Sequence, residues 1–318
     1  MTVEPWISVS STRDVGVADG LDDGARFQPV FLDGFERGAR FAVWWLPANT
    51  SARGTVLCVP SPADEALATR RAISAQAWRL ARSGWIVLVP DLYGCGDSAG
   101  DGDEATLAIW RRDLLRYALL ARQRAPGPAV LWSVAAGSLL AVDLAFALDQ
   151  LLDAIVLWQP CADGDAAADS LAGVARYSPQ LLEALSGLPM QPPPIAEGGR
   201  QPVIGFLEVG PAKSPKRERE CECERERERK CKRDATEPAT EPVGSADTAD
   251  TPGRIAATTR KLLKAWLDAG HLVTAQTVPL VSRPPEADGA TAGTQAFAGT
   301  ALPEALFDAT VEFLDPLR

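Results

Sequence analysis

The sequence is poor in histidine and in positive charge. Its 318 residues include one histidine, and 32 Lys and Arg stand against 42 Asp and Glu, which gives a formal net charge of -10. A protein that binds nucleic acid without sequence preference needs a basic face to displace counterions from the phosphates. The acidic balance therefore argues against that class of function.

Long apolar runs are also missing. The longest stretch without a charged residue, 125–142, is interrupted by Pro126, Gly127, Pro128 and Gly137, whereas a membrane-spanning helix needs about 20 predominantly apolar residues. The first residues, MTVEPWISVSSTRDV, do not show a basic segment followed by an apolar one, which is the pattern of a secretory signal. We expect no membrane span and no export.

Cysteine is too scarce to predict a disulfide framework. Three of the six cysteines, Cys221, Cys223 and Cys231, lie in one highly charged run. Secreted domains that depend on disulfides are far richer in cysteine, so a reducing cytoplasm fits better. Three thiols without a nearby histidine fall short of the four ligands of a structural zinc site. The chain also lacks P-loop, G-x-G-x-x-G and H-E-x-x-H patterns, so we expect no metal and no cofactor.

What the chain does have is an alternation of strand-like and helix-like segments. Thr55–Val59 and Trp85–Val89 are short, apolar and β-rich, and the segment Glu65–Arg82 between them carries apolar residues at helical spacing. This pattern predicts an α/β fold with a mostly parallel central sheet of about eight strands and helices on both faces. Further strands are expected at 27–32, 40–46, 129–132, 154–158, 203–209 and 271–280, the first two as an antiparallel pair, and further helices at 104–124, 138–151, 258–269 and 303–314.

The composition also predicts how the chain is divided. Residues 1–160 form the N-terminal part of the core, and 201–210 with 253–318 complete it. The Ala-, Leu- and Pro-rich residues 161–200 suit a small helical cap over the sheet edge. Residues 211–252, which contain KRERECECERERERKCKRD, offer no apolar face to bury. We expect this segment to be a disordered, charged insertion.

Three segments carry a resemblance to a known fold family. TVLCVP, WIVLVPDLYGCGDSAGD and VLWSVAAGSLLA resemble the strand before the oxyanion loop, the turn after the fourth strand and the nucleophile elbow of α/β-hydrolases. With ATRRAISAQAWRLARSG, AIVLWQP and GVARYSPQLLEAL, the chain resembles the exosortase A system-associated hydrolases of the second type, over about residues 27–210 and 254–316. The resemblance implies an α/β-hydrolase-like fold, an acyl or other small-molecule ligand, and a protein partner in an exopolysaccharide and exosortase system.

The elbow itself lacks its nucleophile. In the G-x-S-x-G pattern the serine stands on a tight turn between a strand and a helix. If Gly137 is the second glycine, Ser133 takes the first glycine position and Ala135 the nucleophile position, where the second type does not reliably carry serine. Ser133 is the candidate nucleophile in another register, which would put the bulky Leu131 at a small position. Ligand binding is expected at the elbow and the oxyanion region, at Pro60, Ser61, Ala135 and Ala136.

A catalytic base is equally hard to find. The only histidine, His271, begins an expected strand, whereas ligands in open α/β sheets bind beyond the carboxyl ends of strands. At a rise of ~3.3 Å per residue, it should lie ~25 Å or more from the elbow, as a surface or edge histidine. The loop 281–301, where a triad histidine would belong, has none. Glu208 is a candidate acid, but it has no histidine to orient.

Two functions therefore remain open. One is a binding or accessory protein on a hydrolase scaffold with a degenerate triad. The other is an active hydrolase of acyl esters or thioesters with a noncanonical nucleophile or base. The repetitive charged run gives some support to a third alternative, a decayed variant of such a protein.

Overall fold

The computed structural model describes most of the two halves of the core that the sequence predicts. The described residues are 12–14, 24–48, 51–62, 65–148, 151–172, 176–195, 201–210, 255–279 and 304–317. The predicted insertion 211–252, with Cys221, Cys223 and Cys231, lies outside them, and so does the loop 281–301.

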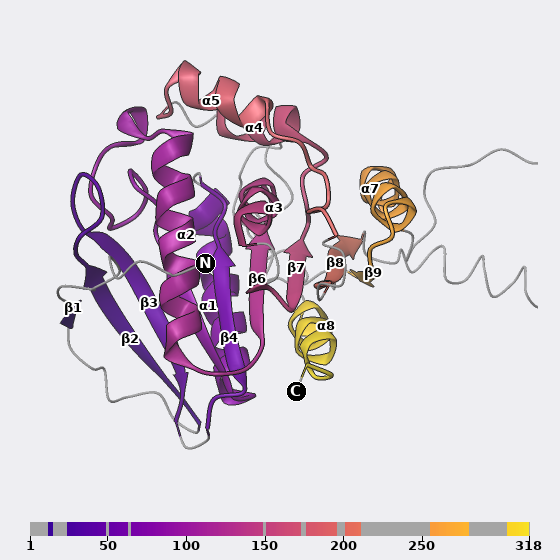
Figure 1. Cartoon of the computed structure of the whole chain (residues 1–318), viewed down its shortest axis with the longest axis horizontal. Helices are drawn as coiled ribbons and strands as arrows, with labels where there is room; N and C mark the ends of the chain where they lie inside the picture. The colour runs from indigo at the N-terminus through magenta and orange to yellow at the C-terminus, as the bar shows by residue number, and fades with distance from the viewer. Residues whose placement is uncertain are drawn as a thin grey trace, which may run out of the picture.

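The described strands form one sheet of nine strands (Figure 1). They are β1 Thr12–Asp14, β2 Ala25–Leu32, β3 Arg40–Pro47, β4 Gly54–Val59, β5 Trp85–Pro90, β6 Ala129–Val134, β7 Ala154–Trp158, β8 Val203–Gly210 and β9 Val273–Pro279. Their order is β1-β2-β3-β5-β4-β6-β7-β8-β9, with antiparallel pairing from β1 to β5 and parallel pairing from β5 to β9. The predicted fold class is confirmed, and the additional strand is the three-residue β1.

Helices cover both faces of this sheet, which is why every residue of β4 and β6 is buried. The helices are α1 Glu65–Arg82, α2 Leu107–Arg124, α3 Gly137–Leu148, α4 Gly164–Ala172, α5 Pro179–Ser186, α7 Ala257–Asp268 and α8 Glu304–Leu314. Within the described ranges, no helix combines the length and apolar character that a bilayer crossing requires.

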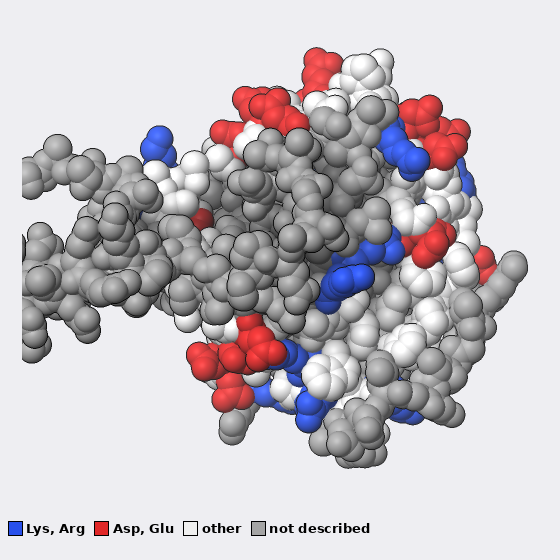
Figure 2. Space-filling model, turned by 180° about the vertical axis from the view of Figure 1, so that it is seen from behind, with Lys and Arg blue, Asp and Glu red and all other residues white. Residues whose placement is uncertain are grey.

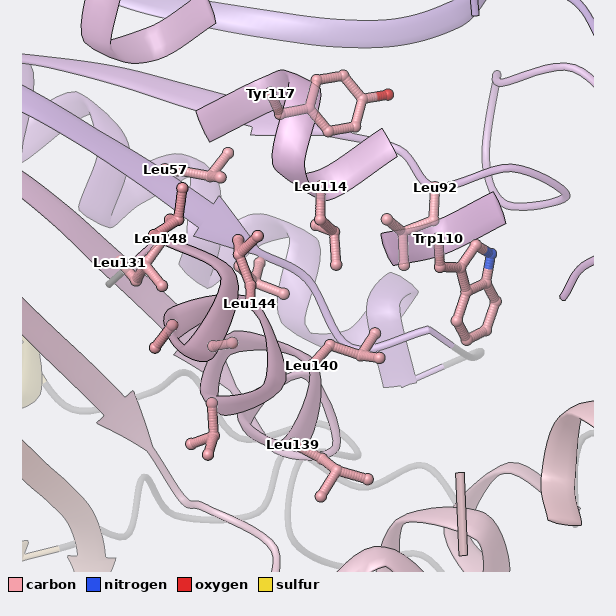
Figure 3. Packing of buried hydrophobic residues seen from close by; sticks show 14 of the residues in the cluster. Leu57, Leu92, Trp110, Leu114, Tyr117, Leu131, Leu139, Leu140, Leu144 and Leu148 are labelled. Carbon is pink, nitrogen blue, oxygen red and sulfur yellow. The ribbon is translucent and has the colours of Figure 1, made fainter. Parts of the chain in front are cut away.

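The sheet separates two layers of core side chains. One layer joins the sheet to α2, α3 and α7, and Figure 3 shows its leucines from β4, β6, α2 and α3 converging. The other layer joins the sheet to α1 and α8 and includes Trp132 and Trp158, whose ring centroids lie 4.8 Å apart. Leu131 and Trp132 of β6 belong to different layers because successive side chains of a strand point to opposite faces.

Ion pairs join the two helices of the second layer at the surface. Arg79 of α1 lies 3.2 Å from Glu304 and 2.8 Å from Asp308 of α8. Figure 2, which views the molecule from behind, shows acidic and basic side chains gathered next to each other on this side. Such exposed pairs contribute about 0–1 kcal/mol each, so the apolar layer beneath them holds α8 in place.

The structure shifts several predicted boundaries for local reasons. α2 begins at Leu107 rather than at residue 104, because Thr106 caps it by accepting a hydrogen bond from the backbone N–H of Ile109. A short 3₁₀ turn, Gly102–Glu104, takes the place of the predicted first turn. β6 runs to Val134 instead of ending at Trp132, so it leads directly into the turn before α3.

Candidate functional site

The turn between β6 and α3 has the backbone of a nucleophile elbow. Only Ala135 and Ala136 separate the strand from the helix, and the φ angle of Ala135 is 48°. A non-glycine residue adopts this left-handed conformation rarely, at a cost of about 1–3 kcal/mol, and such strain clusters at functional sites. The N–H of Ala135 donates to the carbonyl of Trp158 at 2.9 Å, which fixes the turn to β7. A strained residue with a methyl side chain therefore stands at the predicted nucleophile position.

The chain after β4 lies directly against this turn. A Cβ atom on Gly137 would lie 2.6 Å from the carbonyl oxygen of Val59 and 2.7 Å from that of Pro60. Only glycine permits this approach, which brings Pro60 beside the elbow. Ser61 and Ala136 are buried, with 1% and 5% of their surface exposed. The structure thus brings the end of β4 and the start of α3 together, as the sequence suggested.

Ser133 has no route to a substrate in this structure. It lies inside β6, paired in register with Val59 of β4 and Leu157 of β7, and its exposed surface is 0%. Its hydroxyl has no hydrogen-bond partner within the described part of the chain. A nucleophile of this fold must instead be exposed at the top of the sheet. The geometry therefore gives no support to Ser133 as the nucleophile.

Ser138 anchors the chain that follows β7. Its Oγ accepts a hydrogen bond from the backbone N–H of Cys161 at 3.1 Å and lies 3.3 Å from the Cys161 Sγ. Its partner is 23 residues away along the chain, so Ser138 joins the start of α3 to the segment after β7. Burial raises the pKa of the Cys161 thiol, so the thiol stays protonated and is a poor nucleophile near neutral pH.

The GCGDSAGD turn after β5 is built around Asp91. The Asp91 carboxylate accepts from Arg70 Nη2 at 2.9 Å and from the backbone N–H of Asp97 at 2.9 Å. Gly96, with a φ of 56°, leaves room for both side chains, since a Cβ there would lie 2.0 Å from Asp91 and 2.2 Å from Arg70. Burial raises the pKa of Asp91, and Arg70 opposes that rise. The sequence did not reveal the Arg70 partner.

Asp101, at the end of the same turn, also has a structural role. Asp101 precedes the 3₁₀ turn and forms a capping box with Glu104. The Asp91 and Asp101 side chains therefore stabilise turns, and the backbone N–H of Asp97 donates to the first of them.

A tyrosine attaches the predicted cap to the core. The hydroxyl of Tyr177, just before α5, lies 3.3 Å from the Sγ of Cys95 in the turn after β5, and its ring packs edge-on against Trp110 of α2 at 5.7 Å. Burial raises the pKa of the Cys95 thiol to about 11, so this thiol is also protonated at neutral pH. Figure 1 shows α4 and α5 at one end of the molecule, beyond β6 and β7. Cys95, Cys161 and Tyr177 escaped the sequence reasoning because their partners lie far along the chain.

Glu208 caps a helix. The carboxylate, 6% exposed near the end of β8, accepts from the backbone N–H of Ala256 at 2.9 Å and from the hydroxyl of Thr259. Ala256 is the N-cap residue of α7 and has no capping side chain of its own. A carboxylate at this position satisfies a helix donor and interacts favourably with the helix dipole. The structure gives Glu208 this structural role, and no histidine contacts it among the described residues.

Replacing Glu208 with alanine should lower the free energy of unfolding by about 1–2 kcal/mol, because the N–H of Ala256 and the hydroxyl of Thr259 lose their acceptor. Urea denaturation of Glu208→Ala measures this loss, and Glu208→Gln, which keeps an acceptor oxygen, should lose less. Equal stability of the alanine variant and the natural chain would show that the cap contributes nothing.

His271 lies at the opposite edge of the sheet from Ala135. It precedes β9 by two residues, whereas Ala135 follows the carboxyl end of β6, and β6 to β9 are mutually parallel. The expectation of a surface or edge histidine is wrong in one respect, because the side chain is only 5% exposed. Its ring lies 6.3 Å from that of Trp266, and its Nδ1 has no hydrogen-bond partner within the described part of the chain.

Solved structures share this fold. Est1E from Butyrivibrio proteoclasticus matches with a TM-score of 0.55 and 12% identity over 93% of this chain and 99% of that one. Its structure with ferulic acid bound matches with 0.55 and 13%, over 88% and 95%, and a fungal esterase from Rhizomucor miehei with 0.53 and 9%, over 93% and 84%. The chain has the α/β-hydrolase fold.

At such low identities the likeness extends to the α/β-hydrolase fold alone. No protein-family profile and no curated protein sequence matches the chain. Within the described ranges, no group of three His, Cys, Asp or Glu side chains is arranged to hold a metal ion.

Proposed function

We propose that this chain is an accessory protein that binds a ligand on an α/β-hydrolase scaffold and has lost the hydrolytic triad. One observation carries the proposal: Ala135 keeps the strained backbone of the elbow, with its φ of 48°, while its methyl group cannot attack a carbonyl. The only histidine of the chain precedes β9, at the other edge of the sheet. Triad members act as a unit, so the loss of two leaves only the residual catalysis of binding and the oxyanion amides.

The proposed ligand is an acyl compound or another small carboxylic acid. The N-terminal turn of α3, beginning at Gly137, directs the positive end of the helix dipole toward a carbonyl or carboxylate oxygen at the elbow, while the N–H groups of Ser138 and Leu139 already donate to the carbonyls of Ala135 and Ala136. The close approach of Pro60 places the end of β4 at the same point. The ferulic acid bound to Est1E, an aromatic carboxylic acid, supports this class of ligand.

The resemblance to exosortase A system-associated hydrolases supports a protein partner in an exopolysaccharide system, and the low cysteine content supports a place in the cytoplasm. The described cysteines Cys58, Cys95 and Cys161 are free thiols, which agrees with a reducing compartment. The domain boundaries, with a cap at 161–200 and an insertion at 211–252, stay predictions.

The test is to look for hydrolysis and for binding in the same preparation. The natural protein should not react with a fluorophosphonate probe and should not hydrolyse short p-nitrophenyl esters above the buffer rate. Ala135→Ser should remain within about tenfold of that rate, because no histidine is placed to activate the new hydroxyl. Calorimetric titration with ferulate and butyrate should detect binding to both forms.

Esterase turnover by the natural protein would overturn the proposal and favour the active hydrolase. If that turnover disappeared in Ser133→Ala, Ser133 would be the nucleophile. If no turnover and no binding of either carboxylate were measured, the proposed ligand class would be wrong.

A further inference from the structure

A small, partly open cavity lies between α2, the end of α3 and the central strands, far from the elbow. Its volume is about 20 Å³. Thr55 of β4 and Ala129 of β6 line it, and they pair with each other near the amino ends of these two strands. Ala135, by contrast, follows the carboxyl end of β6. The cavity is therefore separate from the proposed ligand site.

The lining of this cavity is apolar apart from Thr55 and Arg122. Figure 3 shows three of the lining residues, Leu57, Leu131 and Leu148, together at one end of the core layer. A buried water needs about two to four polar partners, and this lining offers few. An apolar group is therefore the occupant that the lining favours.

The size of the cavity limits what can enter. One water-sized group needs about 10–15 Å³, and the cavity provides about 20 Å³. It therefore admits the branched end of one aliphatic side chain and excludes a long acyl chain. Leu151 lines the cavity and is 42% exposed, so the apolar lining continues to the surface. Partner proteins commonly insert an anchoring side chain into a pocket of this kind.

Arg122 stands at this cavity with an uncompensated charge. α2 carries five arginines, and within the described ranges four of them bind oxygen atoms of other parts of the chain; these four are Arg111, Arg112, Arg116 and Arg124. Arg122 is exposed and has no hydrogen bond or ion pair among the described residues. Its guanidinium is therefore available to a carboxylate from outside the chain, which it can bind through two parallel hydrogen bonds.

We propose that the cavity docks a partner protein, which inserts one aliphatic side chain of about the size of leucine and places a neighbouring carboxylate against Arg122. The apolar lining and the volume select the side chain, and the unpaired guanidinium selects the charge beside it. Arginine next to an apolar pocket is a frequent centre of binding energy in protein interfaces. This docking site does not depend on the proposed ligand, since it lies at the other end of β6 from the elbow.

Blocked pentapeptides are the probes for this site. Acetyl-Ala-Asp-Leu-Asp-Ala-amide offers a leucine flanked by carboxylates, and its binding can be followed by the methyl signals of protein labelled with ¹³C at leucine. The signals of Leu148 and Leu152 should shift with a dissociation constant in the millimolar range, whereas that of Leu139, in the first turn of α3, should not. Shifts at Leu139 alone would place the peptide at the elbow and overturn the proposal.

Two further peptides separate the anchor from the charge. The peptide with alanine in place of leucine should bind at least about tenfold more weakly, because the cavity stays unfilled. The peptide with asparagine in place of both aspartates should bind about two- to fivefold more weakly, which is the usual effect of an exposed ion pair. Equal affinities of all three peptides would show that neither group is recognised.

Variants of α2 test the two groups from the protein side. In Arg122→Gln the aspartate and asparagine peptides should bind equally, whereas Arg124→Gln, an exposed arginine of the same helix, should behave like the natural protein. Ala118→Leu, which enlarges a side chain of the lining, should abolish the shifts. A preference for aspartate that survives in Arg122→Gln would overturn the proposal.

Two measurements distinguish a partner protein from other occupants. Free 4-methylpentanoate, which has the same branched end and one carboxylate, should bind more weakly than the aspartate peptide. If it bound more tightly, the occupant would be a small carboxylate. Sedimentation should show no self-association that depends on Arg122, since an association lost in Arg122→Gln would make the occupant a second copy of this chain. Either result would overturn the proposal.

Discussion

Replacing Arg40 with methionine should lower the free energy of unfolding by about 3–5 kcal/mol. Arg40 is 0% exposed, and its Nε donates to the Asp113 carboxylate at 2.6 Å. Its other nitrogens donate to the carbonyls of Gly38 at 2.9 Å and of Glu36 at 2.7 Å, and the guanidinium lies 4.6 Å from the ring centre of Tyr93. Methionine fills part of the volume but leaves the Asp113 carboxylate buried without its counter-charge.

A second ion pair provides the control. Arg111 and Asp143 form a two-pronged pair at 2.7 Å, but half of the Arg111 side chain is exposed. Arg111→Met should therefore cost no more than about 1 kcal/mol in the same urea denaturation. Equal losses for Arg40→Met and Arg111→Met would contradict the argument from burial.

The double variant Arg40→Met with Asp113→Leu separates the charge from the packing. Burial raises the pKa of Asp113 although the Arg40 guanidinium opposes the rise, so the pair does not fully compensate the removal of the carboxylate from water. Removing both charges should therefore recover a large part of the stability that Arg40→Met loses. A double variant as unstable as Arg40→Met would show that the hydrogen bonds of Arg40, and not the buried charge, account for the loss.

The strands of the sheet were predictable because their cause is local. β4, β5 and β7 are short apolar runs, and a strand covered on both faces by helices needs this pattern. β1 was missed because three residues, Thr12–Asp14, cannot show a period of two convincingly. The start of α2 was predicted three residues too early, because the cap that Thr106 provides outweighs the helical pattern of the residues before it.

The candidate site was predictable only where the backbone itself determines it. Gly137 anchors the elbow, and from it the position of Ala135 follows. The partners of polar side chains do not follow in this way: Glu208 accepts from Thr259, 51 residues further along the chain, and Ser138 accepts from the backbone of Cys161, 23 residues further along. A carboxylate at the end of a strand therefore resembled a triad acid in the sequence, although it caps a helix in the fold.

Replacing Gly137 with alanine should lower the free energy of unfolding by about 3 kcal/mol, at the upper end of the usual cost of overpacking. The added methyl group would lie 2.6 Å from the carbonyl oxygen of Val59 and 2.7 Å and 2.8 Å from the oxygen and carbon of the Pro60 carbonyl. All three are backbone atoms, which cannot rotate away as a side chain can. An alanine inside a helix normally gains about 1 kcal/mol over glycine, so the clash must outweigh that gain for the sign to be a loss.

Gly187 is the matched control for this substitution. It follows α5 with a helical φ of −74°, and the nearest atoms to an added Cβ, the carbonyl oxygens of Ala184 and Glu183, lie 3.7 Å away. Gly187→Ala should therefore leave stability unchanged or raise it by up to about 1 kcal/mol. If Gly137→Ala matched this control in urea denaturation, the end of β4 would not be pressed against α3, and the close approach that defines the elbow would be absent from the folded protein. If Gly137→Ala is destabilised as expected, its affinity for carboxylates should fall as well, because the only relief for the clash is to move Pro60 away from the start of α3.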